Sequence, residues 1–447
     1  MADLIGSVWW MIVSLGLLVT FHEFGHFWVA RRCGVKVLRF SVGFGQPLWT
    51  RRDRHGTEFV VAALPLGGYV RMLDEREGNV HPAERAMAFN RKPVGQRIAI
   101  VVAGPLANLL LCMLLLWVMF IVGRQDYSAT VGQATGLAAE AGLRPGDRIA
   151  RVGERPVVTW GEASTQLTLA ALDRQDVSLE AIDTLGDSRR VSLPLSRLPA
   201  QFDEQQVPAL AGLAWQFQQQ PAVVSQVEPG AAADGLLEAG DRILAIDGQS
   251  IDSADQVSPQ INALGRRGGP GMIEVEREGD RLALELTPRR AGQDWRIGVA
   301  MAAGQAPAYD ARIQYGPLAA VPVAIRETGH AAIDSLGMLK RLVTGQASLK
   351  NVSGPVTIAR VANASAKRGM DWFLYFLAAM SLSLAILNLL PIPILDGGHL
   401  LYYLIELIKG SPLSERAMAA GQYVGLAVLA GLMGLAFYND ILGLLPR

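Results

Sequence analysis

Leu4-Ile-Gly-Ser-Val-Trp-Trp-Met-Ile-Val-Ser-Leu-Gly-Leu-Leu-Val-Thr-Phe-His22-Glu23-Phe-Gly-His26 lies at the start of this 447-residue chain and decides how the rest is interpreted. The apolar residues before His22 make a segment long enough to cross a membrane as a helix. On a helix, His22 and His26 lie on one face, where their ring nitrogens can hold one metal ion. Glu23 points into the same cleft and is placed to take a proton from water. Because such residues are costly within a membrane helix, the stretch predicts a metal centre rather than a chance match or a packing cluster.

The composition indicates a membrane protein with a large soluble insert. Half of the residues are hydrophobic and the formal net charge is zero, so nothing suggests a nucleic-acid partner or a disordered chain. Four stretches have the length and purity of membrane helices: residues 4–30, 97–123, 372–395 and 417–438. The first lacks a basic start and a small-residue cleavage site, so we do not expect a removable signal peptide. About 245 residues of soluble composition separate the second stretch from the third, and they contain no cysteine, which excludes a disulfide framework there.

The distribution of basic residues predicts the orientation. The first eight residues contain no Lys or Arg, whereas residues 31–97 contain thirteen. By the positive-inside rule residues 31–97 face the cytoplasm, and counting helices places both termini and the 124–371 insert in the periplasm. His22 then lies roughly 27 Å along the helix from Leu4, near the cytoplasmic leaflet.

The third apolar stretch is expected to supply a third metal ligand. It also runs inward, and it ends in Asn388-Leu-Leu-Pro391-Ile-Pro393-Ile-Leu-Asp396-Gly-Gly-His399, so Asp396 reaches the depth of the histidines. A two-histidine site needs a third ligand and an open position for water, and a carboxylate provides that ligand. Pro391 and Pro393 break the helix, and broken backbone at membrane depth must face protein or a water-lined cavity. A simple helix exit is the alternative explanation for the prolines, and His399 is a fallback ligand that we expect outside the membrane.

Together these motifs resemble the site-2 protease family of intramembrane zinc metalloproteases. The resemblance rests on His22 to His26, on Gly104-Pro105-Leu-Ala-Asn108 in the second apolar stretch and on Asn388 to Asp396, and it covers nearly the whole chain. It implies a zinc metalloendopeptidase that hydrolyses peptide bonds within or near the transmembrane helix of a single-pass membrane protein. By the same resemblance, His22, His26 and Asp396 hold one Zn²⁺ per chain and Glu23 is the general base.

The resemblance also implies supporting residues and a biological setting. Asn388 matches the family position that handles the unwound substrate, and Asn108 supports the active site, although by itself Asn108 is equally compatible with helix packing. The implied substrate is a membrane-bound anti-sigma factor that another protease has already trimmed, as part of an envelope stress response. Remnant signal peptides are a second implied substrate, and the implied location is the inner membrane of a Gram-negative bacterium.

Residues 38–70 have the alternation typical of strands. Val37-Leu-Arg-Phe-Ser-Val and Glu58-Phe-Val-Val-Ala-Ala-Leu are joined through Gly43-Phe44-Gly45, which predicts β-hairpins at the cytoplasmic interface. The edge of such a sheet can pair with an extended substrate, so Gly43, Phe44 and Gly45 are candidate substrate-binding residues. A structural cap over the helices is equally compatible with the pattern.

The insert contains an internal repeat. Leu143-Arg-Pro-Gly-Asp147-Arg-Ile149 aligns with Leu237-Glu-Ala-Gly-Asp241-Arg-Ile243, 94 residues further on. This pattern is similar to that of PDZ domains, whose groove accepts an extended peptide by strand addition. The resemblance to the site-2 proteases implies that the two domains exclude substrates with bulky external parts, a role that we prefer to the binding of peptide tails. A generic pair of small β-rich domains is the alternative to PDZ domains.

The expected architecture is a polytopic α-helical membrane protein with a membrane-associated β-sheet and an inserted pair of PDZ-like α+β domains. Its parts in order are the first transmembrane helix (1–37), the β-hairpin region (38–96), the second helix (97–123), the PDZ-like domains (126–218 and 219–308), an amphipathic helix within a linker (309–371), and the third and fourth helices (372–396 and 417–438).

Two rival functions are weaker, and the oligomeric state is not predicted. A PDZ adaptor that senses misfolded envelope proteins would have no use for a base, Glu23, beside two ligands. A zinc transporter would show further polar residues along its path, whereas one polar cluster is visible.

Overall fold

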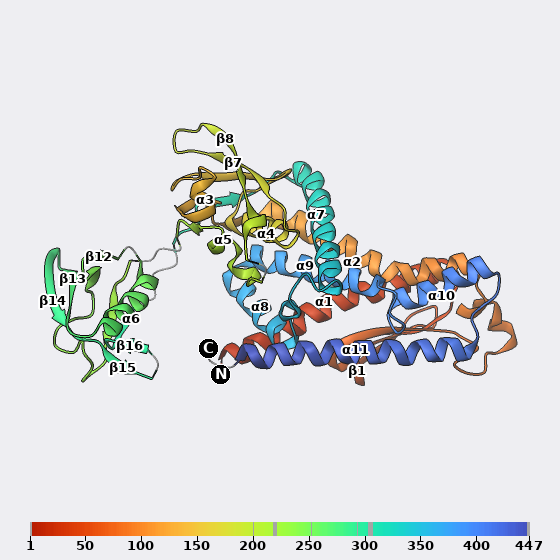
Figure 1. The fold of residues 1–447 in the computed structure, drawn as a ribbon. Helices are drawn as coiled ribbons and strands as arrows, with labels where there is room; N and C mark the ends of the chain where they lie inside the picture. The colour runs from red at the N-terminus through yellow and green to blue at the C-terminus, as the bar shows by residue number, and fades with distance from the viewer. Residues whose placement is uncertain are drawn as a thin grey trace. The chain divides into compact units, whose positions relative to one another are not determined.

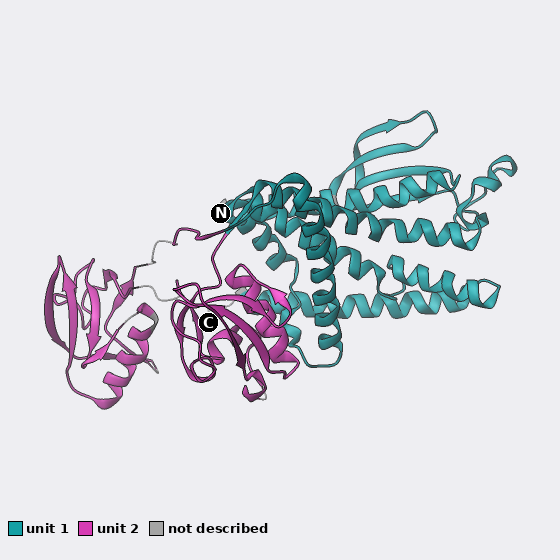
Figure 2. Cartoon of the chain, turned by 90° about the horizontal axis from the view of Figure 1, so that it is seen from above, with its two compact units in different colours: residues 1–125, 312–447 teal, residues 126–311 magenta. Residues whose placement is uncertain are grey.

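The computed structural model describes residues 2–199, 201–217, 221–251, 253–292, 294–302 and 307–444. The chain forms two compact units, shown in different colours in Figure 2. Residues 1–125 and 312–447 make the first unit, which carries the apolar helices, and residues 126–311 make the second. The second unit is thus an insertion between two halves of the first.

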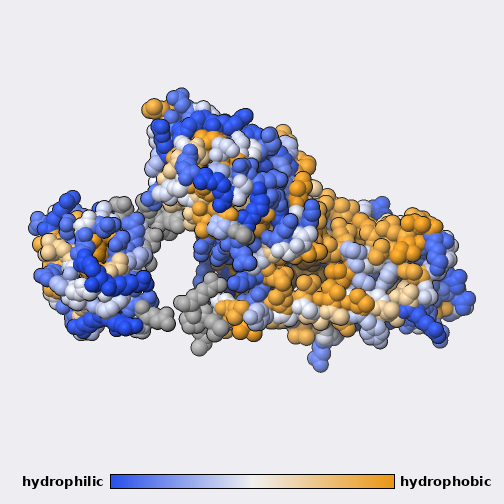
Figure 3. Space-filling view, viewed as in Figure 1, coloured by the Kyte–Doolittle hydropathy of each residue, from blue (hydrophilic) through white to orange (hydrophobic). Residues whose placement is uncertain are grey.

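Four long helices have the length and apolar composition needed to cross a membrane, which confirms the predicted number of spans. They are α1 (Ala2–Arg32), α2 (Val94–Val122), α9 (Met370–Leu389) and α11 (Glu415–Leu444). α1 packs against α2, and α2 packs against α9 (Figure 1), and in Figure 3 hydrophobic side chains form a continuous band over the helical part of the first unit.

The third apolar stretch ends earlier than expected. α9 stops at Leu389, residues 390–395 form a loop, and Asp396 begins a separate helix, α10 (Asp396–Lys409). The proline rings at 391 and 393 remove two backbone donors and disfavour helical geometry in the preceding residues, so the helix cannot continue. Asp396 therefore lies in the first turn of a new helix and not at the end of the third span.

Small residues bring α1 close to α2. A methyl group added at Gly25 would overlap the Ala103 carbonyl oxygen and the side chain of Ala107. The glycine therefore sets the face of α1 that carries His22 and His26 directly against α2.

Two long strands, β1 (Val37–Arg52) and β2 (Glu58–Met72), form one sheet. Because the strands bend, different parts of each strand pair side by side within this sheet. Residues 39–42 pair with 68–71 on one side and with 58–61 on the other, and 58–62 also pair with 47–52. The bend that allows this lies at Gly43 and Gly45, both at positive φ. As a consequence residues 68–72 form an edge of the sheet. Two 3₁₀ helices follow, η1 (Pro82–Met87) and η2 (Phe89–Arg91).

The inserted unit consists of two similar halves. The first contains a four-stranded sheet in the order β6-β5-β7-β8, and the second contains the corresponding sheet β12-β11-β13-β14. Each half adds a separate strand pair, β4 with β9 and β10 with β17. The elements of the first half are β4 (Val131–Ala134), α3 (Gly136–Glu140), β5 (Arg148–Val152), β6 (Arg155–Pro156), α4 (Trp160–Leu172), β7 (Val177–Ile182), β8 (Ser188–Leu193), η3 (Leu195–Arg197), η4 (Glu204–Gln206), α5 (Val207–Leu210) and β9 (Leu213–Trp215). Those of the second are β10 (Val224–Val227), β11 (Arg242–Ile246), β12 (Gln249–Ser250), η5 (Ala254–Gln256), α6 (Val257–Arg267), β13 (Gly271–Arg277), β14 (Asp280–Leu286), β15 (Arg289–Ala291), β16 (Asp294–Arg296) and β17 (Val299–Met301).

The repeated Gly-Asp motif has the same structural role in both halves. Asp147 and Asp241 are buried, and each accepts a hydrogen bond from the backbone N–H three residues earlier, at 2.7 and 2.8 Å. Each also pairs with an arginine from the hairpin of its own sheet, Arg189 with Asp147 and Arg277 with Asp241. The motif therefore marks a buried carboxylate that pairs with a partly exposed arginine and joins a turn to the sheet.

The Asp241 pair leads to a pH-dependent prediction. Bidentate hydrogen bonds of 2.7 Å from Arg277 hold the pKa of the Asp241 carboxyl below its usual value. A depressed pKa in the folded state stabilises the fold above the unfolded value of about 3.9, and this stabilisation is lost as the pH falls through the folded value. We expect Arg277→Met to cost roughly 3 kcal/mol at pH 7, the lower end of the range for a broken buried pair. Amides of β11 and β13 should then exchange with deuterium on the order of 100-fold faster than in the wild type.

The ratio between variant and wild-type exchange rates, taken at the same pH, should approach one as the pH is lowered below about 4. Arg266→Met is the control, because Arg266 forms no hydrogen bond or ion pair with the residues that the structure describes. A ratio for Arg277→Met that does not change with pH would contradict the assignment of Asp241 as the group whose ionisation stabilises this half.

The first unit resumes with β18 (Ala311–Ile313), which pairs with β3 (Arg124–Asp126). The start of α9 is tied to the same region: the Gln125 N–H donates to Asp371 at 3.1 Å, and the Trp372 indole donates to the Gln125 carbonyl at 3.1 Å. The points where the chain leaves and re-enters this unit are therefore fastened together.

Two further helices, α7 (Pro317–Val343) and α8 (Pro355–Arg368), precede α9, and η6 (Leu349–Asn351) lies between them. α7 coincides with the predicted amphipathic helix, whereas α8 lies in what was expected to be linker. Asp440 of α11 caps α8: its carboxylate accepts hydrogen bonds from the backbone of Gly354, Val356 and Thr357 at 2.8–3.2 Å. This buried carboxylate fixes the end of α11 to the start of α8.

Candidate metal centre and active-site cavity

Three potential ligand atoms converge where α1 meets α10. His22 Nε2 and His26 Nε2 lie 3.2 Å apart, and Asp396 Oδ2 lies 3.1 Å from the first and 3.4 Å from the second. In a tetrahedral zinc site with bonds of about 2.0–2.1 Å, neighbouring ligand atoms are about 3.3 Å apart. The triangle formed by these three atoms therefore has the dimensions of one face of such a site. This is the one group of three or more potential ligands found among the described residues.

The hydrogen bonds around the triangle fit a bound cation. Asp396 Oδ2 is buried and has no hydrogen-bond partner of its own, which is costly unless a cation satisfies it. His26 Nδ1 lies 2.8 Å from the Ile100 carbonyl oxygen, so this nitrogen carries the proton and donates. The lone pair of His26 is then on Nε2, which faces Asp396. These residues fit a zinc ion.

Asn108 of α2 contacts the other histidine. Its amide group lies 3.2 Å from His22 Nδ1, and its Oδ1 atom is buried without a partner. Turning the amide by 180° places Oδ1 against His22 Nδ1, where it accepts the proton that a ligand bound through Nε2 must carry on Nδ1. Asn108 Oδ1 and His22 Nδ1 are then hydrogen-bonded to each other. Gly104, one turn before Asn108, leaves room for the rings, since an added methyl would overlap His26 Nε2.

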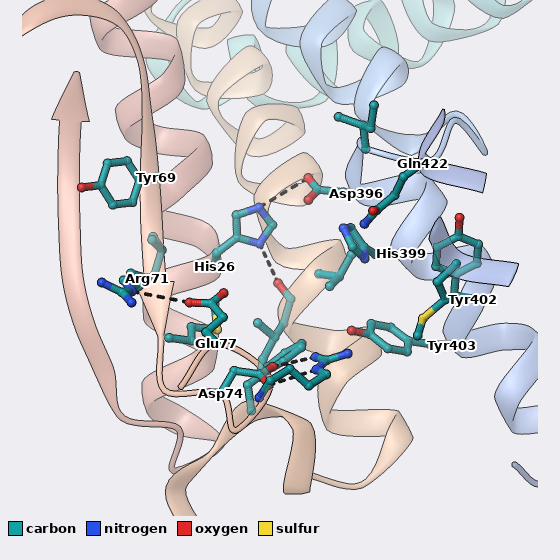
Figure 4. A pocket seen from close by; sticks show the side chains of 18 of the residues that line it. His26, Tyr69, Arg71, Asp74, Glu77, Asp396, His399, Tyr402, Tyr403 and Gln422 are labelled. Carbon is teal, nitrogen blue, oxygen red and sulfur yellow. Dashed lines mark hydrogen bonds and ion pairs between the residues drawn. The ribbon is translucent and has the colours of Figure 1, made fainter. Parts of the chain in front are cut away.

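A cavity of about 920 Å³ opens from the three ligand atoms. Glu23 lines it beside His22 and His26, and a methyl group built at Gly68 of β2 would lie 3.4 Å from Glu23 Cγ. Edge residues 69–72 of β2 form one wall, and residues of α10 and α11 form another. Figure 4 shows Asp396, His399 and Gln422 on one side of His26 and Tyr69 on the other. A carboxylate beside a metal site, in a cavity that admits water, can accept and return a proton.

The far part of the cavity is charged, and its charges are mostly paired. Arg71 lies 3.4 Å from Glu77, and Arg76 forms a bidentate pair with Asp74. Next to the cavity-lining Tyr403, Arg97 of α2 makes a bidentate pair with Glu406 of α10 at 2.6 and 3.1 Å. This last pair is largely buried and fixes the far end of α10 against α2.

Comparison with known proteins decides the family. The sequence pattern of peptidase family M50 matches residues 10–432. The chain belongs to peptidase family M50. A "Putative zinc metalloprotease" of Xylella fastidiosa (strain 9a5c) is 64% identical over 444 residues, which cover 99% of this chain and 100% of that protein. "Regulator of sigma-E protease RseP" of Escherichia coli (strain K12) is 41% identical over 441 residues, covering 96% of this chain and 97% of that protein. The protein of the same name from Salmonella typhimurium (strain 14028s / SGSC 2262) is 40% identical over 439 residues, with the same coverage.

The resemblance to the site-2 proteases is thus confirmed, and relatives named RseP share about 40% of the sequence. This M50 peptidase is a membrane protein and a zinc metalloprotease of the site-2 type, with zinc as its cofactor. Membership of a peptidase family also favours an enzyme over the adaptor and transporter alternatives.

Other predicted site residues lie at varying distance from the cavity of this M50 peptidase. Asn388 is the penultimate residue of α9 and is not among the cavity-lining residues. Gly43 and Gly45 form the bend in β1, and the ring of Phe44 stacks on the cavity-lining Tyr69 with centroids 6.0 Å apart. His399, which we expected outside the membrane, lines the cavity one turn after Asp396 but is not part of the ligand triangle.

The loop that carries Asp396 is held by α11, a contact that sequence reasoning missed. A methyl group added at Gly425 would overlap the Pro393 carbonyl oxygen, and one at Gly421 would overlap the Tyr402 hydroxyl. Within the same loop Ile394 has φ +113°, an unusual conformation for a β-branched residue that needs support from its surroundings. The four-residue spacing of the two glycines was visible in the sequence, but their partner was not.

We expect Gly425→Ala to lower zinc affinity by about 10- to 100-fold, the usual cost of losing support for a metal ligand. The added methyl would push the Pro393 carbonyl away and shift the loop that ends at Asp396. Gly434→Ala is a matched control, because no atom lies within 4 Å of a methyl group built there. Competition with a chelator measures the affinity of both variants. Equal affinities would show that α11 does not position Asp396.

Proposed function

We propose that this M50 peptidase hydrolyses peptide bonds within or near the transmembrane segment of single-pass membrane proteins. The observation that carries the proposal is the ligand triangle of His22, His26 and Asp396, formed between apolar helices beside an open strand edge. A hydrolytic site in such a place acts on peptides that reach it from the membrane, and an edge strand can hold them extended.

In this proposal His22, His26 and Asp396 hold the zinc ion and Glu23 is the general base. Zinc at this position supplies Lewis-acid chemistry, lowering the pKa of water and polarising the carbonyl of the scissile bond. Glu23 takes the proton of the attacking water as its oxygen bonds to the carbonyl carbon. The protonated Glu23 then gives that proton to the amide nitrogen as the carbon–nitrogen bond breaks. The products are a carboxylic acid and an amine, which exchange one proton to give a carboxylate and an ammonium group, and Glu23 is regenerated as a carboxylate.

Substrate is proposed to pair with residues 68–72 of β2. This segment is the edge of its sheet, and Tyr69 to Met72 line the cavity that contains Glu23. A helical peptide must unwind before its bonds can be cut, and strand pairing compensates the backbone groups that unwinding frees. Gly43, Phe44 and Gly45 support this edge through the Phe44–Tyr69 stack. Asn388 is proposed to contact the unwound substrate, with Pro391 and Pro393 shaping the approach to Asp396.

The two halves of the inserted unit are proposed to be PDZ-like domains that exclude substrates with large external parts. Gly212 and Gly298 occupy equivalent turns at positive φ before β9 and β17, and each of these strands pairs with one neighbour among the described strands. An open strand after a glycine turn is the arrangement in which PDZ domains accept a peptide. The open edges of β9 and β17 therefore make peptide binding the alternative role of these domains.

The proposed setting is the inner membrane of a Gram-negative bacterium. Both termini and the inserted unit would face the periplasm, and the ligand triangle would lie near the cytoplasmic leaflet. The substrate would be an anti-sigma factor trimmed by another protease, and remnant signal peptides would be a second class. The names of the relatives from Escherichia coli and Salmonella typhimurium, regulators of sigma-E, support this setting.

The test uses one single-pass substrate in two forms, with and without its folded external domain. The wild-type enzyme should cleave the trimmed form and leave the full-length form intact. Replacing residues 126–311 by a short linker should allow cleavage of both forms. If the wild type cleaves neither form while zinc is bound, the proposed activity is wrong. If the shortened enzyme still discriminates, the filter is wrong and the activity stands.

A further inference from the structure

α11 places one amide side chain in the active-site cavity. Four of its residues line that cavity: Glu415, Met418, Ala419 and Gln422. Their spacing puts them on one face of the helix. From Ala417 to Phe437 Gln422 is the only residue with a charged or amide side chain. An amide in an apolar helix is costly unless it faces a partner or a cavity.

Gln422 has no polar partner among the residues that the structure describes. The other polar groups of α11 are used structurally: Asn439 donates to the carbonyls of Leu349 and Val352, and Asp440 caps α8. Gln422, in contrast, forms no hydrogen bond with any residue in the described part of the chain. In Figure 4 its side chain reaches from α11 toward Asp396 and His399. Its donors and its acceptor are thus directed into the space beside a metal ligand.

The opposite wall of the cavity is the open edge of β2. Residues 69–72 line it, and their sheet partners lie on the side away from the cavity. A strand that pairs with this edge satisfies the backbone groups along one of its own edges. The groups along its other edge then face α10 and α11, where no strand is available to receive them.

We propose that the Gln422 amide hydrogen-bonds the main chain of the bound substrate, on the edge that faces away from β2. This inference rests on the proposed function, because it takes an extended peptide as the occupant of the cavity. A primary amide offers an acceptor and two donors, which match the N–H and C=O groups of a peptide unit. Gln422 thereby acts as a positioning residue that holds the scissile bond in register with Glu23 and Asp396. It recognises backbone and not side chain, so it is compatible with substrates of differing sequence.

The test combines Gln422→Met with substrates in which one peptide bond at a time is replaced by an ester. The ester lacks the N–H donor and has a weaker acceptor. Against the all-amide substrate, Gln422→Met should lower kcat/KM by about 3- to 15-fold, the effect of one hydrogen bond. With wild-type enzyme, the ester at one or two positions should cause a loss of similar size. At those positions the two changes should not be additive, because both remove the same bond.

Two controls make the result specific. Tyr423→Phe removes a polar group from the same turn of α11 outside the cavity-lining set, and it should leave kcat/KM and the ester profile unchanged. Zinc content should be the same in all variants. A kcat/KM for Gln422→Met within twofold of the wild type, or additive losses at every ester position, would overturn the proposal.

Peptide binding to the Glu23→Gln form separates this inference from the proposed activity. Gln422→Met in that background should raise Kd for the all-amide peptide by about 3- to 15-fold and abolish the ester effect at the same positions. If the wild type does not cleave but this binding pattern appears, the activity is wrong and the contact is right. If cleavage occurs but binding and kcat/KM do not depend on Gln422, the activity stands and the contact is wrong.

Discussion

Glu23→Gln is expected to lower kcat/KM by about 10²- to 10⁴-fold while one zinc ion per chain remains bound. The amide has nearly the same size as the carboxylate but cannot take a proton from water. Glu23 lies beside the ligand triangle without being part of it, so the metal should stay. The measurement is cleavage of a trimmed single-pass substrate, together with zinc content by atomic absorption.

The matched control is Glu77→Gln. Glu77 lines the same cavity but pairs with Arg71 at 3.4 Å, so its loss should change kcat/KM by no more than a few-fold. If the Glu23 variant cleaved as fast as the wild type, the assignment of the base would be wrong. If it lost zinc as well as activity, Glu23 would have to be counted with the ligands.

Asp396→Ala should lower zinc affinity by more than about 100-fold and abolish cleavage. Loss of a residue that merely supports a ligand already costs about 10- to 100-fold, and loss of a ligand costs more. Its Oδ2 atom lies within 3.4 Å of both histidine nitrogens and is otherwise unsatisfied, which makes it the natural third ligand. Zinc stoichiometry after dialysis against a weak chelator gives the result.

Asp74→Asn serves as the comparison, since Asp74 lines the same cavity and pairs with Arg76 away from the triangle. That variant should retain one zinc per chain. Zinc retention by Asp396→Ala would exclude Asp396 as a ligand and turn attention to His399, which lies one turn further along α10. Both variants are measured at the same free zinc concentration. Circular dichroism then shows whether a loss of zinc reflects lower affinity or an unfolded protein.

The parts of the site that share one helix or one motif were predictable from the sequence. The four-residue spacing of His22 and His26 fixes their common face whatever the rest of the chain does. Asp396 was expected beside the histidines because the charge distribution and the helix lengths predict the same depth for both segments, and the structure brings the three residues together. The repeat around Asp147 and Asp241 was visible, and the structure adds that both aspartates are buried and paired with arginine.

What could not be predicted depends on contacts between distant segments. The start of α10 at Asp396 follows from two prolines, but the support of that loop by Gly425 requires knowledge of where α11 packs. Asp440 looks like an unexplained charge in an apolar helix until α8 is placed beside it. The edge character of residues 68–72 depends on strand order, which the alternation of residues 38–70 does not determine.

The junction at Gln125 has a consequence for evolution and engineering. The ligand triangle is assembled from segments before residue 125 and after residue 312, and contacts of Gln125 with Asp371 and Trp372 fasten the stem of the insertion. Closing a longer loop costs free energy that grows only with the logarithm of its length. The first unit can therefore carry inserted domains of very different size between residues 125 and 312. During evolution the inserted domains can be replaced by others. In engineering, an unrelated domain or a fluorescent reporter can be inserted there without changes to the metal site.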